Sequence, residues 1–121
     1  MLQAKRFEAP DEVRKFTGET GQIQLVNLDG NAVGRGTFRP GWRWSENVKP
    51  LSGTHSCEVA HVGYVVEGRM HVVMDSGEEL EVGPGDVFHM PPGHDAWIVG
   101  EEACVLLDFG GLSGYANGAN A

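Results

Sequence analysis

Apolar and polar residues alternate along many short segments of this chain. Ile23 and Leu25 occupy alternate positions ahead of the turn-forming pair Asp29 and Gly30, and a second strand-like segment covers 32–38. Alternation with a period of two is typical of a half-buried β-strand, and an Asp-Gly pair favours the tight turn of a hairpin. The pattern therefore predicts a β-hairpin in this part of the chain.

Similar segments recur through the rest of the chain, separated by Gly, Pro and Asp residues that favour turns. The further strand candidates are 55–67, 69–74, 78–82, 87–90, 97–99 and 103–109. The longest of them ends at Gly68. Many short strands at intervals of about eight to twelve residues are typical of an all-β sandwich or closed barrel. We therefore expect an all-β fold.

Two segments lack this alternation. Pro and acidic residues begin the segment 10–16 and basic residues end it, an order that predicts a short N-terminal helical turn. Residues 39–53 show no period of two or 3.6 and are predicted to form a long loop. Two interpretations of its Trp42 and Trp44 stay open. They cap the barrel or fill a subunit contact, or they form a lid over a pocket.

The length of 121 residues suits one domain, which can bury enough surface to fold without disulfide staples. We expect an N-terminal arm at 1–20, a barrel at 21–112 and a flexible tail at 113–121, where the residues are small and uncharged. The 18 Gly and 6 Pro suit short strands joined by tight turns better than long helices.

The net charge of −8 argues against nucleic acid and anionic membrane surfaces as partners, because both attract clustered Lys and Arg. No segment approaches the roughly 18 apolar residues of a membrane span, and the start lacks the apolar centre of a secretory signal. We therefore expect a cytoplasmic protein. In a reducing compartment Cys57 and Cys104 are expected to be free thiols or metal ligands rather than a disulfide.

Three residues that can ligate a metal lie close together at the start of the longest predicted strand. In an extended strand His55, Cys57 and His61 share one face, because alternate side chains point to the same side. One thiolate with two imidazoles is a ligand set that suits Zn²⁺. The alternative is an exposed His55, a Cys57 that packs as a small apolar residue, and a hydrogen-bonded core His61.

A fourth ligand would come from another part of the chain, and His94 is the best candidate. Asp95 could ligate instead, or could orient a ligating imidazole through a hydrogen bond. His71 and His89 lie in short predicted strands whose inward face is ambiguous. The sequence alone identifies no catalytic residue.

Two segments resemble the motifs of the cupin family. Residues 85–93 are similar to the second cupin motif, in which a Gly, five residues and Pro-x-Gly follow one another. Residues 55–68 resemble the first motif, with His55, Cys57 and His61 at the places of its ligands. The resemblance implies a double-stranded β-helix, or jelly-roll barrel, that holds one metal ion, commonly iron, manganese, nickel or zinc.

The chain departs from the cupin pattern at three ligand positions. Cys57 stands where a second His is usual, His61 where a Glu is usual, and Ala96 where the second motif has its His. These substitutions count against the reactions with O₂ that members of the family with a ferrous ion carry out, and the thiolate favours zinc. With His94 the site would be closed and structural, and without it a three-ligand site would keep an open position.

The sequence thus predicts a small cupin-type protein with one divalent metal ion, zinc in preference to iron, manganese or nickel. We expect it to act on, or bind, a small polar molecule inside the barrel. A non-catalytic ligand-binding or sensing module and a metal-free barrel remain as alternatives. We also expect a homodimer, with the N-terminal hairpin and Trp42 or Trp44 as its apolar surface.

Overall fold

The computed structural model describes residues 1–110, and these form nine β-strands in two antiparallel sheets. The strand order is β1-β2-β3-β9-β4-β7 in the larger sheet and β6-β5-β8 in the smaller. The bounds are β1 Glu12–Lys15, β2 Gly21–Leu28, β3 Asn31–Phe38, β4 His61–Glu67, β5 Met70–Met74, β6 Glu79–Val82, β7 Val87–Met90, β8 His94–Ile98 and β9 Cys104–Asp108. The all-β jelly-roll prediction is confirmed. The predicted tail lies outside the described residues, and the proposed division into arm, barrel and tail stays a prediction.

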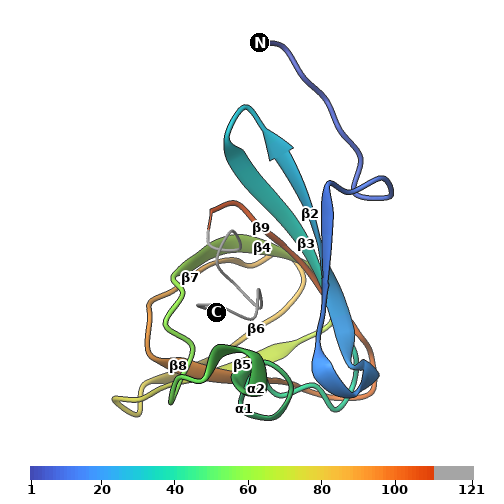
Figure 1. Cartoon of the computed structure of the whole chain (residues 1–121). Coiled ribbons are helices and arrows are strands. Elements are labelled where there is room, and N and C mark those ends of the chain that lie inside the picture. The colour runs from blue at the N-terminus through green and yellow to red at the C-terminus, as the bar shows by residue number, and fades with distance from the viewer. Residues whose placement is uncertain (111–121) are drawn as a thin grey trace.

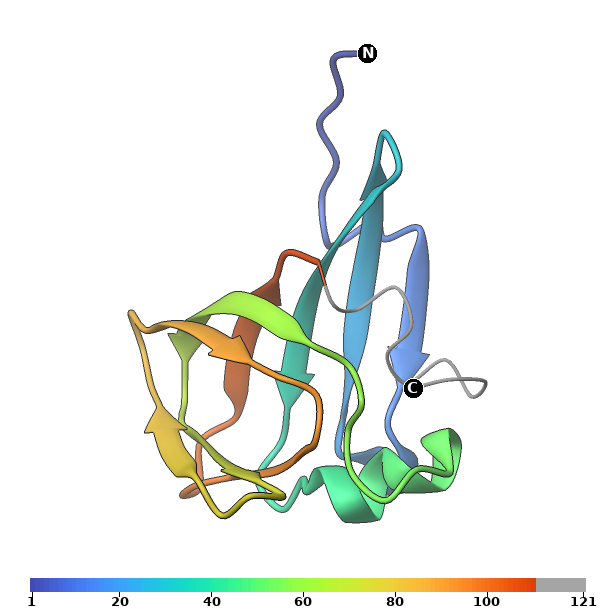
Figure 2. The same ribbon diagram turned by 90° about the vertical axis from the view of Figure 1, so that its left-hand side faces the viewer.

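The strands from β4 to β9 curve around a common interior, while the hairpin β2–β3 extends beyond the barrel on one side (Figures 1 and 2). The hairpin turns at Asp29 and Gly30, which both have positive φ angles, 50° and 85°. Two successive positive φ angles define the tight turn whose twist matches that of the flanking strands. The predicted hairpin is therefore confirmed, and its turn explains the Asp-Gly pair.

The core lies between the two sheets and follows the alternation of the strands. Ile23 and Leu25 of β2 and Cys104 and Leu106 of β9 are all buried. The same alternation continues into polar residues, because Asp108 at the end of β9 is only 1% exposed. Polar side chains are thus directed into an otherwise apolar interior, where each needs a partner.

Two one-turn helices replace the predicted long loop, α1 at Trp44–Asn47 and α2 at Lys49–Ser52. The loop prediction was wrong because burial of Trp42 and Trp44, 2% and 1% exposed, folds this segment against the barrel. The two indoles therefore offer no exposed apolar surface to a second subunit. No helix within residues 1–110 is long and apolar enough to cross a membrane.

The N-terminal segment forms strand β1 where a helical turn was predicted. Its residues pair with β2 in antiparallel register, and the Asp11 amide donates to the carbonyl of Leu25 at 2.8 Å. A helix of one or two turns is marginal in water, so pairing with a preformed strand outweighs the local charge order. The only turn of helix before β2 in the described chain is the 3-10 turn Thr17–Glu19.

Two strands begin at different residues from those predicted. β4 begins at His61, six residues after the predicted start, because residues 54–56 form a bend in which the Thr54 hydroxyl donates to the Ser56 carbonyl at 2.7 Å. β8 begins at His94, ahead of the predicted 97, since it pairs with β5 over its whole length. Both shifts change which histidines point into the barrel.

Candidate metal centre

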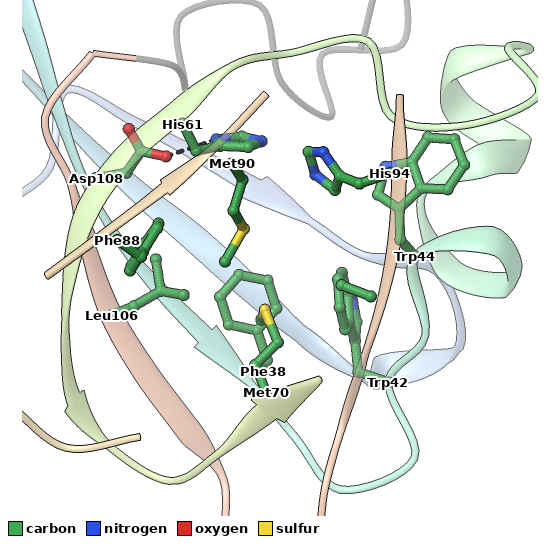
Figure 3. Close-up of a pocket in the computed structure, with 11 residues that line it drawn as sticks. Phe38, Trp42, Trp44, His61, Met70, Phe88, Met90, His94, Leu106 and Asp108 are labelled. Atoms are coloured by element: carbon green, nitrogen blue, oxygen red, sulfur yellow. Dashed lines mark hydrogen bonds and ion pairs between the residues drawn. The ribbon is translucent and has the colours of Figure 1, made fainter. Parts of the chain in front are cut away.

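Cys57, His61 and His94 converge at one end of the barrel interior. Their ligand atoms all lie within 4.8 Å of one another, and the three residues are 0%, 7% and 3% exposed. The rings of His61 and His94 lie opposite each other across the top of the pocket, with centroids 5.5 Å apart (Figure 3). The chain therefore brings three soft or borderline donors to one buried point.

The backbone holds Cys57 against His94. The two residues form an isolated antiparallel bridge, in which the Cys57 amide donates to the His94 carbonyl at 2.8 Å. In the register of β4 with β7, His61 pairs with Met90. Cys57 lies four residues before His61, and its partner His94 lies four residues after Met90, so the bridge continues the same register. Cys57 and His61 therefore stay on the same face even though the strand between them is interrupted.

Hydrogen bonds orient both imidazoles toward this point. Nδ1 of His61 donates to Oδ2 of Asp108 at 2.6 Å, and Nδ1 of His94 donates to the carbonyl oxygen of Pro91 at 2.7 Å. A carbonyl oxygen can only accept, so His94 carries its proton on Nδ1, and a carboxylate partner assigns the same tautomer to His61; each imidazole then has a lone pair on Nε2. Imidazoles at metal sites are held in this way, with the second nitrogen bonded to a carboxylate or carbonyl.

The spacing of the ligand atoms fits a zinc ion. Bond lengths of about 2.3 Å to sulfur and about 2.0–2.1 Å to nitrogen place two tetrahedral ligands about 3.6 Å apart. Sγ of Cys57 lies 3.7 Å from Nε2 of His61. The cluster can therefore hold an ion of this size without rearrangement of that pair.

Burial shifts the protonation of two of these ligands. It raises the pKa of the Cys57 thiol to about 12, and it lowers the pKa of His94. Both shifts favour the neutral form, because a buried charge loses its hydration. In the absence of an ion the thiol is therefore protonated at neutral pH, and a bound cation would displace that proton.

Asp108 is a site residue that the sequence analysis missed. It occupies β9 next to Gly34 of β3 and Gly63 of β4, and its Oδ1 accepts a bond from the Gly110 amide at 3.1 Å. The signal was present in the sequence, since a period of two from Cys104 and Leu106 places position 108 on the inward face. An acid at an inward position of the last apolar strand is expected to have a polar partner inside.

The other candidate residues lie away from the cluster. His55 is exposed in the bend at 54–56, and the structure does not bring it to the other ligands. Asp95 accepts a hydrogen bond from the Ser45 amide at 3.1 Å, so it holds helix α1 rather than an imidazole. His71 stacks on Trp97 with centroids 4.7 Å apart, and His89 is exposed.

A cavity adjoins the cluster on the barrel side. It is lined by His61 and His94 at one end and by apolar side chains elsewhere, such as Phe38 and Met70 (Figure 3). Its volume is about 30 Å³, the space of about two water molecules. A ligand group that enters this cavity reaches the two imidazoles.

These features define a class of protein, a small two-sheet β-barrel with a buried Cys, His and His cluster beside an internal cavity. Residues 44–110 match the family model described as cupin domain, which covers more than half of the chain. The protein belongs to the cupin domain family, and the resemblance seen in its sequence is confirmed. No curated protein matches the chain.

Several solved structures share the fold. A protein of unknown function from Rhizobium leguminosarum bv. viciae is 26% identical, with a TM-score of 0.57 over 78% of this chain and 85% of that one. A cupin-like protein from Thermotoga maritima is 20% identical, with a TM-score of 0.58 over 81% and 72%. The polyketide cyclase RemF from Streptomyces resistomycificus is 21% identical, with a TM-score of 0.61 over 89% and 78%. The last two likenesses show the fold alone.

Proposed function

We propose that this cupin binds one zinc ion through Sγ of Cys57 and Nε2 of His61 and His94, and presents it to a small molecule in the barrel. The observation that carries the proposal is the pair of Nδ1 hydrogen bonds, from His61 to Asp108 and from His94 to Pro91. Because both Nδ1 atoms are engaged as donors, both imidazoles direct a lone pair toward the cluster that includes the Cys57 thiol.

Zinc is favoured over iron, manganese or nickel by the donor set. A thiolate with two imidazoles suits a borderline-soft ion. The Glu that the cupin motif usually has among its ligands is replaced in this chain by His61. Among the described residues the cluster contains three ligands, the number found at zinc sites that keep a position for a water or substrate. A zinc ion held there would act as a Lewis acid toward a ligand oxygen.

Cys57, His61 and Asp108 also have the order of a thiol, base and carboxylate, the arrangement of a nucleophilic cysteine. Two observations favour the metal over this alternative. Burial raises the pKa of Cys57 to about 12, the opposite of the shift that activates a nucleophilic thiol. A triad also gives no role to His94, whose imidazole completes the cluster.

We also propose that the protein works in the cytoplasm, as expected from its sequence. A reducing compartment keeps Cys57 and Cys104 as thiols, the form in which both stand in the structure. A free thiol at Cys57 is the form that can exchange its proton for a metal ion.

Titration of the metal-free protein with Co²⁺ tests the site directly. Cobalt in a tetrahedral site of one thiolate and two imidazoles gives intense visible bands and a near-ultraviolet thiolate-to-metal band that saturate at one ion per chain. Cys57→Ser should lose the thiolate band, whereas the matched variant Cys104→Ser, which changes a buried thiol in β9, should keep it. A wild-type spectrum of hexahydrated cobalt would contradict the proposal.

A further inference from the structure

Two buried hydrogen-bond donors without an acceptor belong to side chains that line the same cavity. Nε1 of Trp42 and Nε1 of Trp44 have no hydrogen-bond partner in the described structure, and the two side chains are 2% and 1% exposed. An N–H group that is buried without a partner loses its hydration and gains nothing in return. Two such groups at one cavity are an unusual cost, which an acceptor supplied from outside would remove.

The two indoles and the metal ligands belong to one cavity. Trp42 and Trp44 line it together with His61 and His94, and Figure 3 shows both indoles on the side of the pocket where His94 lies. Asp108 is on the opposite side, where its oxygens already accept from His61 and Gly110. The unpartnered donors therefore belong to the indole side of the cavity, where a ligand that brings acceptors would suit them.

We infer that the cavity binds a small monocarboxylate, with one oxygen at the metal and the other accepting from the indole N–H groups of Trp42 and Trp44. This inference rests on the proposed metal site and names the class of molecule that the site takes. The volume of about 30 Å³, the space of about two water molecules, matches the two oxygens of one carboxylate group.

Charge and shape agree with this choice. A divalent ion with one thiolate and two neutral imidazoles carries one net positive charge, and the Asp108 carboxylate that offsets it lies on the side of the pocket away from the indoles. An anionic group that enters on the indole side therefore meets the ion rather than Asp108. The remaining lining is apolar, with Phe38 and the flexible side chains of Met70 and Met90. Methionines repack easily, so a short apolar substituent on the acid can be accommodated.

The test uses acetate, with acetamide and methylammonium as a neutral and a cationic molecule of similar size. The metal content of each sample is measured first, and acetate is then titrated into the zinc-loaded protein labelled with ¹⁵N at its indoles. The indole N–H resonances of Trp42 and Trp44 should move downfield to saturation. Trp97 is the internal control, because it lies on the outer face between His71 and Arg43 and its resonance should not move.

Trp44→Phe removes one donor and keeps an aromatic ring. It should raise the Kd for acetate about tenfold, the effect of losing one hydrogen bond to a charged group. Trp97→Phe should leave this Kd unchanged. If Trp44→Phe does not fold, the resonances of the wild-type protein decide alone.

The inference is overturned if the zinc-loaded protein shows no movement of the two resonances, or if acetamide or methylammonium produces the same movement. That result leaves the metal site itself standing, because the metal content of the sample is known. A chain that takes up no metal overturns the proposed function instead. In that case movement of both resonances in the metal-free protein would still support a carboxylate at the indoles, and a lack of movement would exclude it.

Discussion

Nδ1 of His61 donates a hydrogen bond of 2.6 Å to Oδ2 of Asp108, and both side chains are buried. The two residues are 47 positions apart in the chain and meet because β4 pairs with β9. A carboxylate partner fixes the tautomer of an imidazole and raises the basicity of its other nitrogen. Asp108 is therefore a positioning residue that acts on the cluster through His61.

Asp108→Asn keeps an acceptor for Nδ1 but removes the negative charge. The affinity for zinc should fall by about 10- to 100-fold, the usual effect of changing such a partner. Competition with a chelator of known affinity measures the change. Asp95→Asn is the matched control, because Asp95 is a partly buried carboxylate outside the cluster. Equal losses in the two variants would show that Asp108 has no special relation to the metal.

His94→Ala and His55→Ala separate the observed cluster from the cupin motif. The motif places a ligand at His55, whereas in the structure His94 lies with Cys57 and His61. We expect His94→Ala to lower zinc affinity by more than the roughly 100-fold that a supporting hydrogen bond contributes. His55→Ala should bind zinc as the wild type does. A strong loss in His55→Ala would show that residues 54–56 rearrange when the metal binds.

Zinc affinity should rise with pH. The pKa of Cys57 is raised to about 12 by burial, so below that pH the thiol carries a proton that each bound ion must displace. The pKa of His94 is lowered, so this imidazole is already neutral above pH 7 and releases none. The apparent binding constant should therefore increase about tenfold per pH unit between about pH 7 and 9. Calorimetry in buffers of different ionisation enthalpy counts the protons, and a count of zero contradicts a thiolate ligand.

Asp95 stabilises helix α1 from the neighbouring strand. Its Oδ1 accepts from the Ser45 amide, an N–H of the first helical turn that has no partner within the helix. Asp95→Ala should lower the free energy of unfolding by about 1 kcal/mol, the usual cost of losing such a cap. Chemical denaturation measures this loss. Zinc affinity should hardly change, and a variant of unchanged stability would rule out the capping role.

Strand alternation alone predicted a large part of the candidate site. Cys57 and His61 share a face as expected, because the register of β4 with β7 continues through the bridge from Cys57 to His94. His55 does not share it, since the bend at 54–56 interrupts the alternation before the strand begins. A hydrogen bond between a hydroxyl and a carbonyl two residues away leaves no periodic signal in the sequence.

The remaining features depend on contacts between distant segments. The Asp108 carboxylate could be placed on an inward face from the sequence, but its pairing with His61 requires the β4–β9 register. The burial of Trp42 likewise depends on Phe16 and Phe38, which come from other parts of the chain and pack against it with centroids 5.6 and 4.7 Å away. Local patterns do not carry such information.

The metal content of untagged protein, purified without chelator, tests the central claim most directly. Elemental analysis should find about one zinc ion per chain in the wild type and in Cys104→Ser, and close to none in Cys57→Ser and His94→Ala. A wild-type ratio near zero that added zinc does not raise would contradict the account. So would a full complement of zinc in Cys57→Ser and His94→Ala, because the ion would then lie elsewhere.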